Sequence, residues 1–484
     1  MSTRPIRDTE RNYADGLLAR AHDAVNLADA YDQRKVDRLC QAIAWAVTNE
    51  PTFTRLAQMS VAESGLGDPE TRVSKRFRIM GILRDILRQR SIGVIETNPE
   101  RGIIKYGKPV GIVVSLIPAT NPELTPAAVA LCAIKCRDAV IFSPHPRTKN
   151  TTFEIVRIMR EVLEREGACA DLLQCVEAPT IPLAHYLMSA SDLVQATGGG
   201  EMVRAAYSSG KPSYGVGAGN ATMIIDETAD VAEAARNTRI SKTADFGSGC
   251  SCDGNLVVEE SVYDRLLTQL VNEGGYVVTP QEAARLQATL WDGLGRRTPN
   301  TIAISAQRIA SLAGFEIPTD RQFLVVAQQH VGPDYPFSSE KLCVVLSIYK
   351  YHGFESALQL VKEIFDVGGK GHSCGIYSHD EDHVRRLALM APVSRIMVRQ
   401  PQSAGNAGSF TNGMPMTASL GCGTWAGNIT SENIGLKHYM NVTWVSYPIP
   451  EDRPSEQELF GEFYGTATSS ESVHDVSAGS YGAS

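Results

Sequence analysis

The sequence lacks the features that would place a chain in a membrane or on a nucleic acid. No apolar stretch approaches the length of a membrane span, and the N-terminal residues contain no apolar signal core. The formal net charge is -8 and no long basic run occurs, which argues against a nucleic-acid groove or a polybasic membrane patch. We therefore expect a cytoplasmic protein that binds small molecules, with no nucleic-acid or membrane partner.

The cysteines also lack a pattern. The 10 cysteines are scattered along 484 residues and suggest no disulfide framework. Cys132 and Cys136 lie on one side of a predicted helix but have no second pair or nearby histidine at ligand spacing. His379 and His383 are also four residues apart, in an acidic stretch typical of a solvated helix start. We predict no metal site.

Length and hydrophobic pattern together predict two large α/β domains. A chain of 484 residues is too long for one simple core. Short apolar, β-branched runs alternate with helical stretches, which predicts parallel sheets covered by helices on both faces. The strands expected before the middle of the chain cover residues 111–118, 138–143 and 193–197. A second series covers residues 301–305, 323–326, 341–349, 372–377 and 395–399.

Cys250 is the most informative residue of the chain. It lies on a glycine-rich turn, residues 247–254, directly before a predicted buried strand. Such a turn lets a thiol stand clear of its backbone and lets N–H groups point at whatever is bonded to the sulfur. This geometry suits a covalent thiol catalyst. A buried packing cysteine at a tight turn is the structural alternative.

Three further turns follow predicted strands and face the same sheet edge, where ligands of such sheets bind. Gly198, Gly199 and Gly200 precede a helix, so their N–H groups suit a phosphate or a nicotinamide, although three glycines also make an ordinary tight turn. They do not form the G-x-G-x-x-G fingerprint. Asn121, at another strand end, suits oxyanion binding or a plain turn role. The glycine-rich residues 215–220 are interpreted as a loop that approaches the cysteine closely.

Several short strings share the order seen in a known family. They are residues 117–122, 142–147, 196–200, 206–212 and 215–220 before the cysteine, and residues 339–342, 369–372, 420–425 and 431–435 after it. On these strings the chain resembles the aldehyde dehydrogenase superfamily, and within it the CoA-acylating branch. The resemblance extends from the N-terminal helices to about Gly465.

The resemblance implies roles for individual residues. Cys250 matches the nucleophile, Asn121 the oxyanion-binding asparagine, and Glu340 the glutamate that holds the nicotinamide ribose. The remaining residues implied to bind the cofactor are Thr197, Gly198, Gly199 and Gly200 at the nicotinamide and pyrophosphate, Ser143, Pro144, His145 and Arg147 at the adenosine half and at CoA, and Val216 and Gly217. Ser143 replaces the lysine that many relatives place at the ribose, so NAD and NADP both remain open.

The resemblance also implies a division of the chain. The cofactor-binding domain would comprise residues 1–98 and 111–221, and the catalytic domain residues 222–430. Residues 99–110 and 440–450 would form a small oligomerisation element in a homodimer or homotetramer. Residues 466–484 are rich in Ser, Gly, Ala and Thr, which predicts a disordered tail.

One departure from the family pattern indicates the second substrate. Hydrolytic relatives carry a water-activating glutamate where this chain has Val216 between glycines. Without that base the thioester on Cys250 should persist until a stronger nucleophile, the CoA thiol, removes it. The sequence thus predicts NAD(P)-dependent, CoA-acylating oxidation of a short aldehyde. Sulfoacetaldehyde is preferred, with succinate semialdehyde and acetaldehyde as alternatives; Arg395 and Lys437 are the cations considered for a substrate anion.

Two other classes of function stay open at this stage. A thiol hydrolase or acyltransferase with no redox step would pair Cys250 with a histidine, either His372 or His185. That reading leaves the glycine turn at residues 198–200 and Glu340 without a role. A scaffold that keeps the fold but not the catalysis is the other alternative, and the presence of both Cys250 and Asn121 counts against it.

Overall fold

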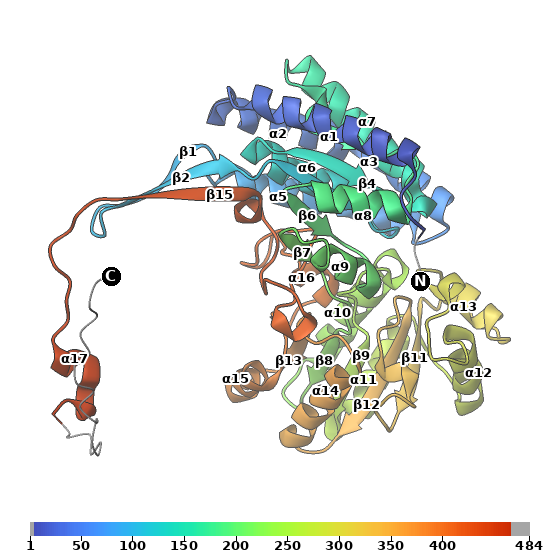
Figure 1. Cartoon of the computed structure of the whole chain (residues 1–484). Coiled ribbons are helices and arrows are strands. Elements are labelled where there is room, and N and C mark those ends of the chain that lie inside the picture. The colour runs from blue at the N-terminus through green and yellow to red at the C-terminus, as the bar shows by residue number, and fades with distance from the viewer. Residues whose placement is uncertain (1–3, 466–484) are drawn as a thin grey trace, which may run out of the picture.

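The computed structural model describes residues 4–465 of the chain (Figure 1). The first sheet has the strand order β5-β4-β3-β6-β7 and is parallel throughout. Every residue of β3 and β4 is buried, as expected for strands covered on both faces. The strands are β3 (Ile112–Leu116), β4 (Ala139–Ser143), β5 (Leu173–Cys175), β6 (Leu193–Ala196) and β7 (Ser213–Gly215).

Helices form two layers around this sheet. All residues of α6 are buried, because α2 and α5 contact its outer side while its inner side faces the sheet. On the other face, α1 contacts α8, β3 and β4. The helices are α1 (Asp8–Ala28), α2 (Gln33–Thr48), α3 (Glu50–Ser64), α4 (Pro69–Arg72), α5 (Arg76–Leu87), α6 (Thr125–Cys136), α7 (Lys149–Arg165), α8 (Ile181–Ala190) and α9 (Gly200–Tyr207).

The second sheet has the order β10-β11-β12-β9-β8-β13-β14 and is also parallel. Its strands are β8 (Thr222–Ile225), β9 (Asn255–Glu259), β10 (Gly275–Val277), β11 (Phe323–Gln328), β12 (Val345–Tyr351), β13 (Cys374–Tyr377) and β14 (Ile396–Val398). Its helices are α10 (Val231–Thr243), α11 (Glu260–Asn272), α12 (Pro280–Leu290), α13 (Ala306–Leu312), α14 (Phe354–Val367), α15 (Glu381–Met390) and α16 (Gln402–Gly405).

The strand expected over residues 301–305 is wrong. A short 3-10 helix covers Pro299–Thr301, and Ala303 adopts a left-handed backbone with φ of 50°. The backbone groups of Ala303 bond outside any sheet, because its N–H donates to Leu342 O and its carbonyl accepts from Gly67 N. The apolar residues of this segment therefore lie in a bend and not in a strand. The other expected strands of the second series correspond to β11, β12, β13 and β14.

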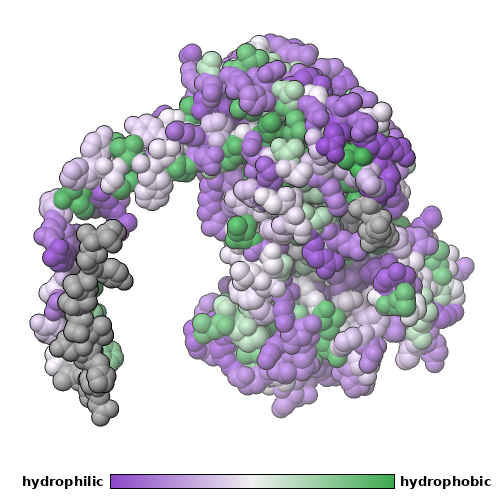
Figure 2. Space-filling view, in the orientation of Figure 1, coloured by the Kyte–Doolittle hydropathy of each residue, from purple (hydrophilic) through white to green (hydrophobic). Residues whose placement is uncertain are grey.

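A third, antiparallel sheet stands apart from the body of the molecule (Figure 1). It joins β1 (Gly93–Asn98), β2 (Ile103–Pro109) and β15 (Met440–Ser446), with β2 in the centre. The chain then continues as an extended arm to α17 (Glu456–Phe460). Apolar side chains are interspersed along this arm (Figure 2), and Trp444 is 61% exposed. Sequence reasoning did not predict β1, and the tail expected at residues 466–484 lies outside the described residues.

Among residues 4–465, no helix combines the length and the apolar character needed to cross a membrane.

Candidate active site

The backbone around Cys250 is held in an unusual path. After α10, Asp245 and Phe246 have left-handed backbones with φ of 50° and 52°, so the chain turns sharply before β9 begins at Asn255. The loop at Gly219 lies directly against this turn, and a Cβ atom at Gly219 would be 1.9 Å from the Cys250 carbonyl oxygen. Only glycine allows that approach. The predicted close contact between the 215–220 loop and the cysteine is confirmed.

A histidine contacts the thiol. His372 Nε2 lies 3.1 Å from Cys250 Sγ, and Nδ1 of the same ring lies 2.8 Å from Ser373 Oγ. Asn406 Nδ2 donates to Ser373 Oγ at 2.9 Å, so a chain of polar contacts supports the imidazole from behind. Sequence reasoning considered His372 only for a reaction without a redox step. His185, the other histidine considered, is exposed on α8.

The electrostatics of this pair favour neutral partners. Burial raises the pKa of the Cys250 thiol, and the Glu340 carboxylate raises it further. Burial also lowers the pKa of His372 to about 3, with a smaller contribution from the Arg395 guanidinium. The resting pair is therefore a thiol beside a neutral imidazole. A neutral imidazole is the form that can accept the thiol proton when the sulfur attacks.

Asn121 belongs to a buried charge cluster that reaches the cysteine segment. Lys75 Nζ donates to Asn121 Oδ1 at 2.7 Å and to Asp245 Oδ2 at 2.8 Å. The fully buried Arg72 also binds Asp245, with 2.8 Å between Nη2 and Oδ2. Burial alone would raise the pKa of Asp245, but the two cations lower it to about 2. Lys75 thus occupies the amide oxygen of Asn121 and fixes which end of the carboxamide remains to act as a donor.

The position of the missing glutamate is apolar. Val216 is buried and packs with Ala407 and Leu420 in a small hydrophobic cluster. Beside it, a Cβ atom at Gly217 would lie 3.5 Å from Cys422 Sγ. No carboxylate belongs to this cluster, so nothing in it can activate a water molecule.

Glu340 lies near Cys250. Its Oε1 accepts from the backbone N–H of Gly219 at 2.9 Å, and it lines one small cavity together with Cys250, Lys242 and Lys341. Burial raises the pKa of Glu340 to about 7. The structure thus brings Glu340 together with the glycine loop and the nucleophile candidate, although Glu340 is 121 residues from Gly219 and 90 residues from Cys250 in sequence.

The residues expected at the cofactor follow the strands of the first sheet. Gly199 caps α9, and a Cβ atom at Gly199 or at Gly200 would meet no atom within 4 Å. Side chains at these positions would fill the open space over the helix N-terminus, so the glycines fit a bound pyrophosphate. Thr197 Oγ1 lies 3.2 Å from Ser419 Oγ.

The second expected cofactor turn follows β4. Ser143 and Pro144 are buried at the strand end, and His145 Nδ1 accepts from the backbone N–H of Arg147 at 3.1 Å. Burial lowers the pKa of His145. Arg147 is exposed, while its Nη2 donates to Ser64 O at 2.5 Å. The turn therefore presents a cation on its outer rim, as binding of a phosphate-bearing ligand requires.

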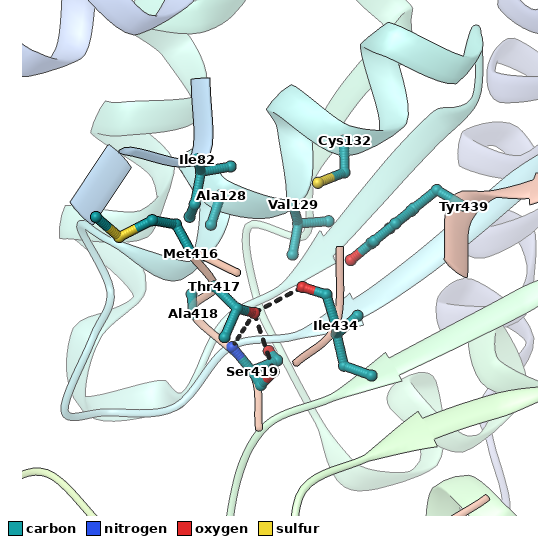
Figure 3. Close-up of a pocket in the computed structure, with 10 residues that line it drawn as sticks. All are labelled: Ile82, Ala128, Val129, Cys132, Met416, Thr417, Ala418, Ser419, Ile434 and Tyr439. Atoms are coloured by element: carbon teal, nitrogen blue, oxygen red, sulfur yellow. Dashed lines mark hydrogen bonds between the residues drawn. The ribbon is translucent and has the colours of Figure 1, made fainter. Parts of the chain in front are cut away.

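The C-terminal segment, residues 416–439, packs against α5 and α6 and is hydrogen-bonded to β6 of the first sheet. Figure 3 shows its contact with α5 and α6 around a small cavity, where Thr417 Oγ1 donates to Ile434 O at 2.6 Å. Ser419 Oγ accepts from Gln195 Nε2, at the end of β6, at 2.8 Å. These contacts place Leu420 against Val216. The cavity lining is mainly apolar and contains neither Cys250 nor His372, so we assign it to packing.

The two cations considered for a substrate anion already have partners within the protein, although Arg395 Nε is buried without one. Arg395 donates to the carbonyl oxygens of His372, Gly421 and Ser431. It thus ties the strand after His372 to the docked C-terminal segment. Lys437 forms an exposed ion pair with Glu432.

These observations define a class: a protein with two parallel α/β sheets, a buried thiol beside a neutral histidine, and a glycine-capped helix at a sheet edge. A profile of the aldehyde dehydrogenase family matches residues 5–279. The chain therefore belongs to the aldehyde dehydrogenase family. The predicted fold class and the resemblance to the acylating branch are both confirmed by the relatives that the chain matches.

The chain is 42% identical to the sulfoacetaldehyde dehydrogenase of Acholeplasma sp. over 452 residues, which cover 92% of this chain and 93% of the relative. It is 41% identical to the sulfoacetaldehyde dehydrogenase (acylating) of Bilophila wadsworthia over 449 residues, covering 92% and 97% of the two chains. The crystal structure of an acetylating aldehyde dehydrogenase from Geobacillus thermoglucosidasius is 34% identical, with a TM-score of 0.89; the match covers 93% of this chain and 100% of that one.

Proposed function

We propose that this protein oxidises a short anionic aldehyde to its acyl-CoA, with NAD or NADP as oxidant, and that sulfoacetaldehyde is the substrate. The observation that carries the proposal is the 3.1 Å contact between His372 and Cys250 in a site whose water-activating position holds the apolar Val216 cluster. The similarity to two sulfoacetaldehyde dehydrogenases supports the substrate. NAD and NADP remain equal alternatives.

In the first step His372 Nε2 accepts the proton of the Cys250 thiol as the sulfur bonds to the aldehyde carbon. The carbonyl π electrons move to the oxygen, and the Asn121 amide together with the Cys250 backbone N–H stabilises the resulting oxyanion. Lys75 holds the other end of that amide. The nicotinamide, when bound beside the Thr197–Gly200 turn, supplies the acceptor for the hydride that leaves the former aldehyde carbon.

In the second step Cys250 carries the acyl group as a thioester. CoA releases its thiol proton to solvent and attacks the thioester carbonyl as the thiolate, the bond to Cys250 breaks, and acyl-CoA leaves. The Cys250 sulfur takes back the proton that His372 accepted in the first step. The apolar side chains of Val216, Ala407 and Leu420 stand where hydrolytic relatives carry their water-activating glutamate, so the thioester survives until CoA arrives. The CoA adenosine half would reach the Ser143–Arg147 turn.

The test is reduction of nicotinamide by purified protein with sulfoacetaldehyde, succinate semialdehyde or acetaldehyde, each with and without CoA and with NAD and NADP in parallel. We expect CoA-dependent activity, greatest with sulfoacetaldehyde. Cys250→Ala should abolish turnover while the circular dichroism spectrum and melting temperature stay close to wild type. Formation of a free acid without CoA, or substantial CoA-dependent activity in Cys250→Ala, would contradict the proposal.

We also propose the division into domains that the sequence suggested. β3 to β7 would belong to the cofactor-binding domain (1–98 and 111–221), and β8 to β14 to the catalytic domain (222–430). The small sheet supports a homodimer or homotetramer, because β15 is one of its edges and carries the exposed Trp444. Light scattering after size exclusion measures the mass; a monomer at micromolar concentration would exclude both assemblies.

A further inference from the structure

Arg78 differs from the other cations at the start of α5. Arg72 and Lys75 pair with Asp245, and Arg76 pairs with Glu50. Among residues 4–465, no carboxylate lies within ion-pair distance of Arg78. The side chain is partly exposed, yet its Nη1 is buried and has no hydrogen-bond partner. A buried guanidinium nitrogen without a partner is costly, and such a group is a natural site for an anionic ligand.

The place of Arg78 relates it to the reacting thiol. Nη2 is 3.4 Å from Ser403 O, so the guanidinium lies between α5 and α16. The backbone N–H of Ser403 donates to Ser241 Oγ, which also accepts from the backbone N–H of Asp253 in the cysteine turn. Ser403 and Ser241 thus connect Arg78 to Asp253, which follows Cys250 by three residues.

The guanidinium of Arg78 keeps its charge at neutral pH. Burial lowers the pKa of Arg78 to about 10, and the charge on Cys250 opposes that change. The guanidinium therefore remains protonated at neutral pH. A two-carbon aldehyde bound to the sulfur carries its anionic group only one methylene away from the reacting carbon.

We infer that Arg78 is the receptor for the anionic group of the aldehyde, a sulfonate or a carboxylate, and so determines the substrate class. This inference rests on the proposed function. The fork of N–H groups on a guanidinium matches two oxygens of either anion. Arg395 Nε is also buried without a partner, but both terminal nitrogens of Arg395 donate to backbone carbonyls, and Lys437 pairs with Glu432. Arg78 has one terminal nitrogen without a partner and a second with only the 3.4 Å contact to Ser403 O, so it can present both to an anion.

The experiment compares an anionic and a neutral substrate. Sulfoacetaldehyde and acetaldehyde are assayed at saturating CoA with wild type, Arg78→Met and Arg78→Lys. We expect kcat/KM for sulfoacetaldehyde to fall at least about 100-fold in Arg78→Met, chiefly through KM, and kcat/KM for acetaldehyde to change less than about 3-fold. Arg78→Lys should recover part of the loss. Arg76→Met, which removes a neighbouring cation paired with the exposed Glu50, is the matched control and should leave the substrate preference unchanged.

A second measurement does not depend on turnover. Ethanesulfonate should slow iodoacetamide labelling of Cys250 in wild type and in Arg76→Met, but not in Arg78→Met. Equal loss of activity with both aldehydes, or equal protection in wild type and Arg78→Met, would overturn the receptor role. Absence of CoA-dependent activity with every aldehyde in wild type would instead overturn the proposed function, and the labelling result would still decide the role of Arg78. Melting temperatures identify any variant that fails to fold.

Discussion

Replacement of His372 by alanine tests the resting state of the thiol. In wild type the buried imidazole has a pKa of about 3, while burial raises the pKa of the Cys250 thiol. A thiolate–imidazolium pair is therefore disfavoured before substrate binds, and in the proposed mechanism His372 accepts the proton during the attack. Removal of such a base typically slows a reaction by about 10²–10⁴-fold, which corresponds to about 3–5 kcal/mol of activation free energy.

The pH dependence gives the more specific result. His372 is neutral at every pH above about 3, so thiol attack in wild type should show no acid limb near pH 6.5. In His372→Ala the sulfur can react only as free thiolate. Because the thiol pKa is raised by burial, the rate should then increase about tenfold per pH unit throughout pH 6–9.

The assay is labelling of Cys250 by iodoacetamide as a function of pH, followed by nicotinamide reduction at the same pH values. His185→Ala is the control, because His185 is exposed on α8 and should not affect either measurement. Wild-type rates in His372→Ala, or a wild-type labelling profile that already rises tenfold per pH unit, would refute the role of His372 as the proton acceptor.

The remaining predictions concern the rest of the site. If Lys75 acts by holding the Asn121 amide, Lys75→Met and Asn121→Ala should each reduce kcat by about 10²–10³-fold. The double variant should then be no slower than Asn121→Ala, whereas additive effects would show that Lys75 acts elsewhere. Val216→Glu should lower the free energy of unfolding by about 2–4 kcal/mol in urea titrations, because it buries a carboxyl in an apolar cluster. The same variant should divert product to the free acid, and acyl-CoA as its sole product would contradict the role of residue 216 in preventing hydrolysis. Burial lowers the pKa of His372 from about 6.5 to about 3, so the free energy of unfolding should decrease by about 5 kcal/mol as the pH falls from 6.5 to 3 and the buried imidazole must take up a proton. Unfolding titrations of His372→Gln against pH should lack that decrease. An unchanged acid dependence in this variant would place the histidine in a polar environment.

Much of the fold could be predicted from local pattern. The runs that became β3, β4 and β6 are apolar and short, and a strand buried on both faces requires such a run wherever it occurs. The cysteine turn and the glycines at residues 198–200 were recognisable because close backbone approach requires glycine locally. The segment at residues 301–305 shows the limit of this reasoning: its apolar residues are buried in a bend, and burial alone does not distinguish a bend from a strand.

The site could be predicted only in part. Cys250, Asn121 and Glu340 were selected by resemblance, but their partners come from distant parts of the chain. His372 is 122 residues from Cys250, and Lys75 is 170 residues from Asp245. The sequence offers Arg395 as a candidate anion receptor, and nothing local to it indicates that three backbone carbonyls occupy its two terminal nitrogens.

The sequence alone was enough to predict the class of fold, to propose Cys250 as the nucleophile and to identify the missing water-activating carboxylate, because each depends on residues that are adjacent or in a fixed local pattern. The tertiary structure alone decided the protonation state of the Cys250–His372 pair, the orientation of Asn121 by Lys75, and the unpaired state of Arg78. These properties depend on burial and on which charges lie nearby. Both are set by how the two sheets and the C-terminal segment pack together, and a linear sequence does not specify that packing residue by residue.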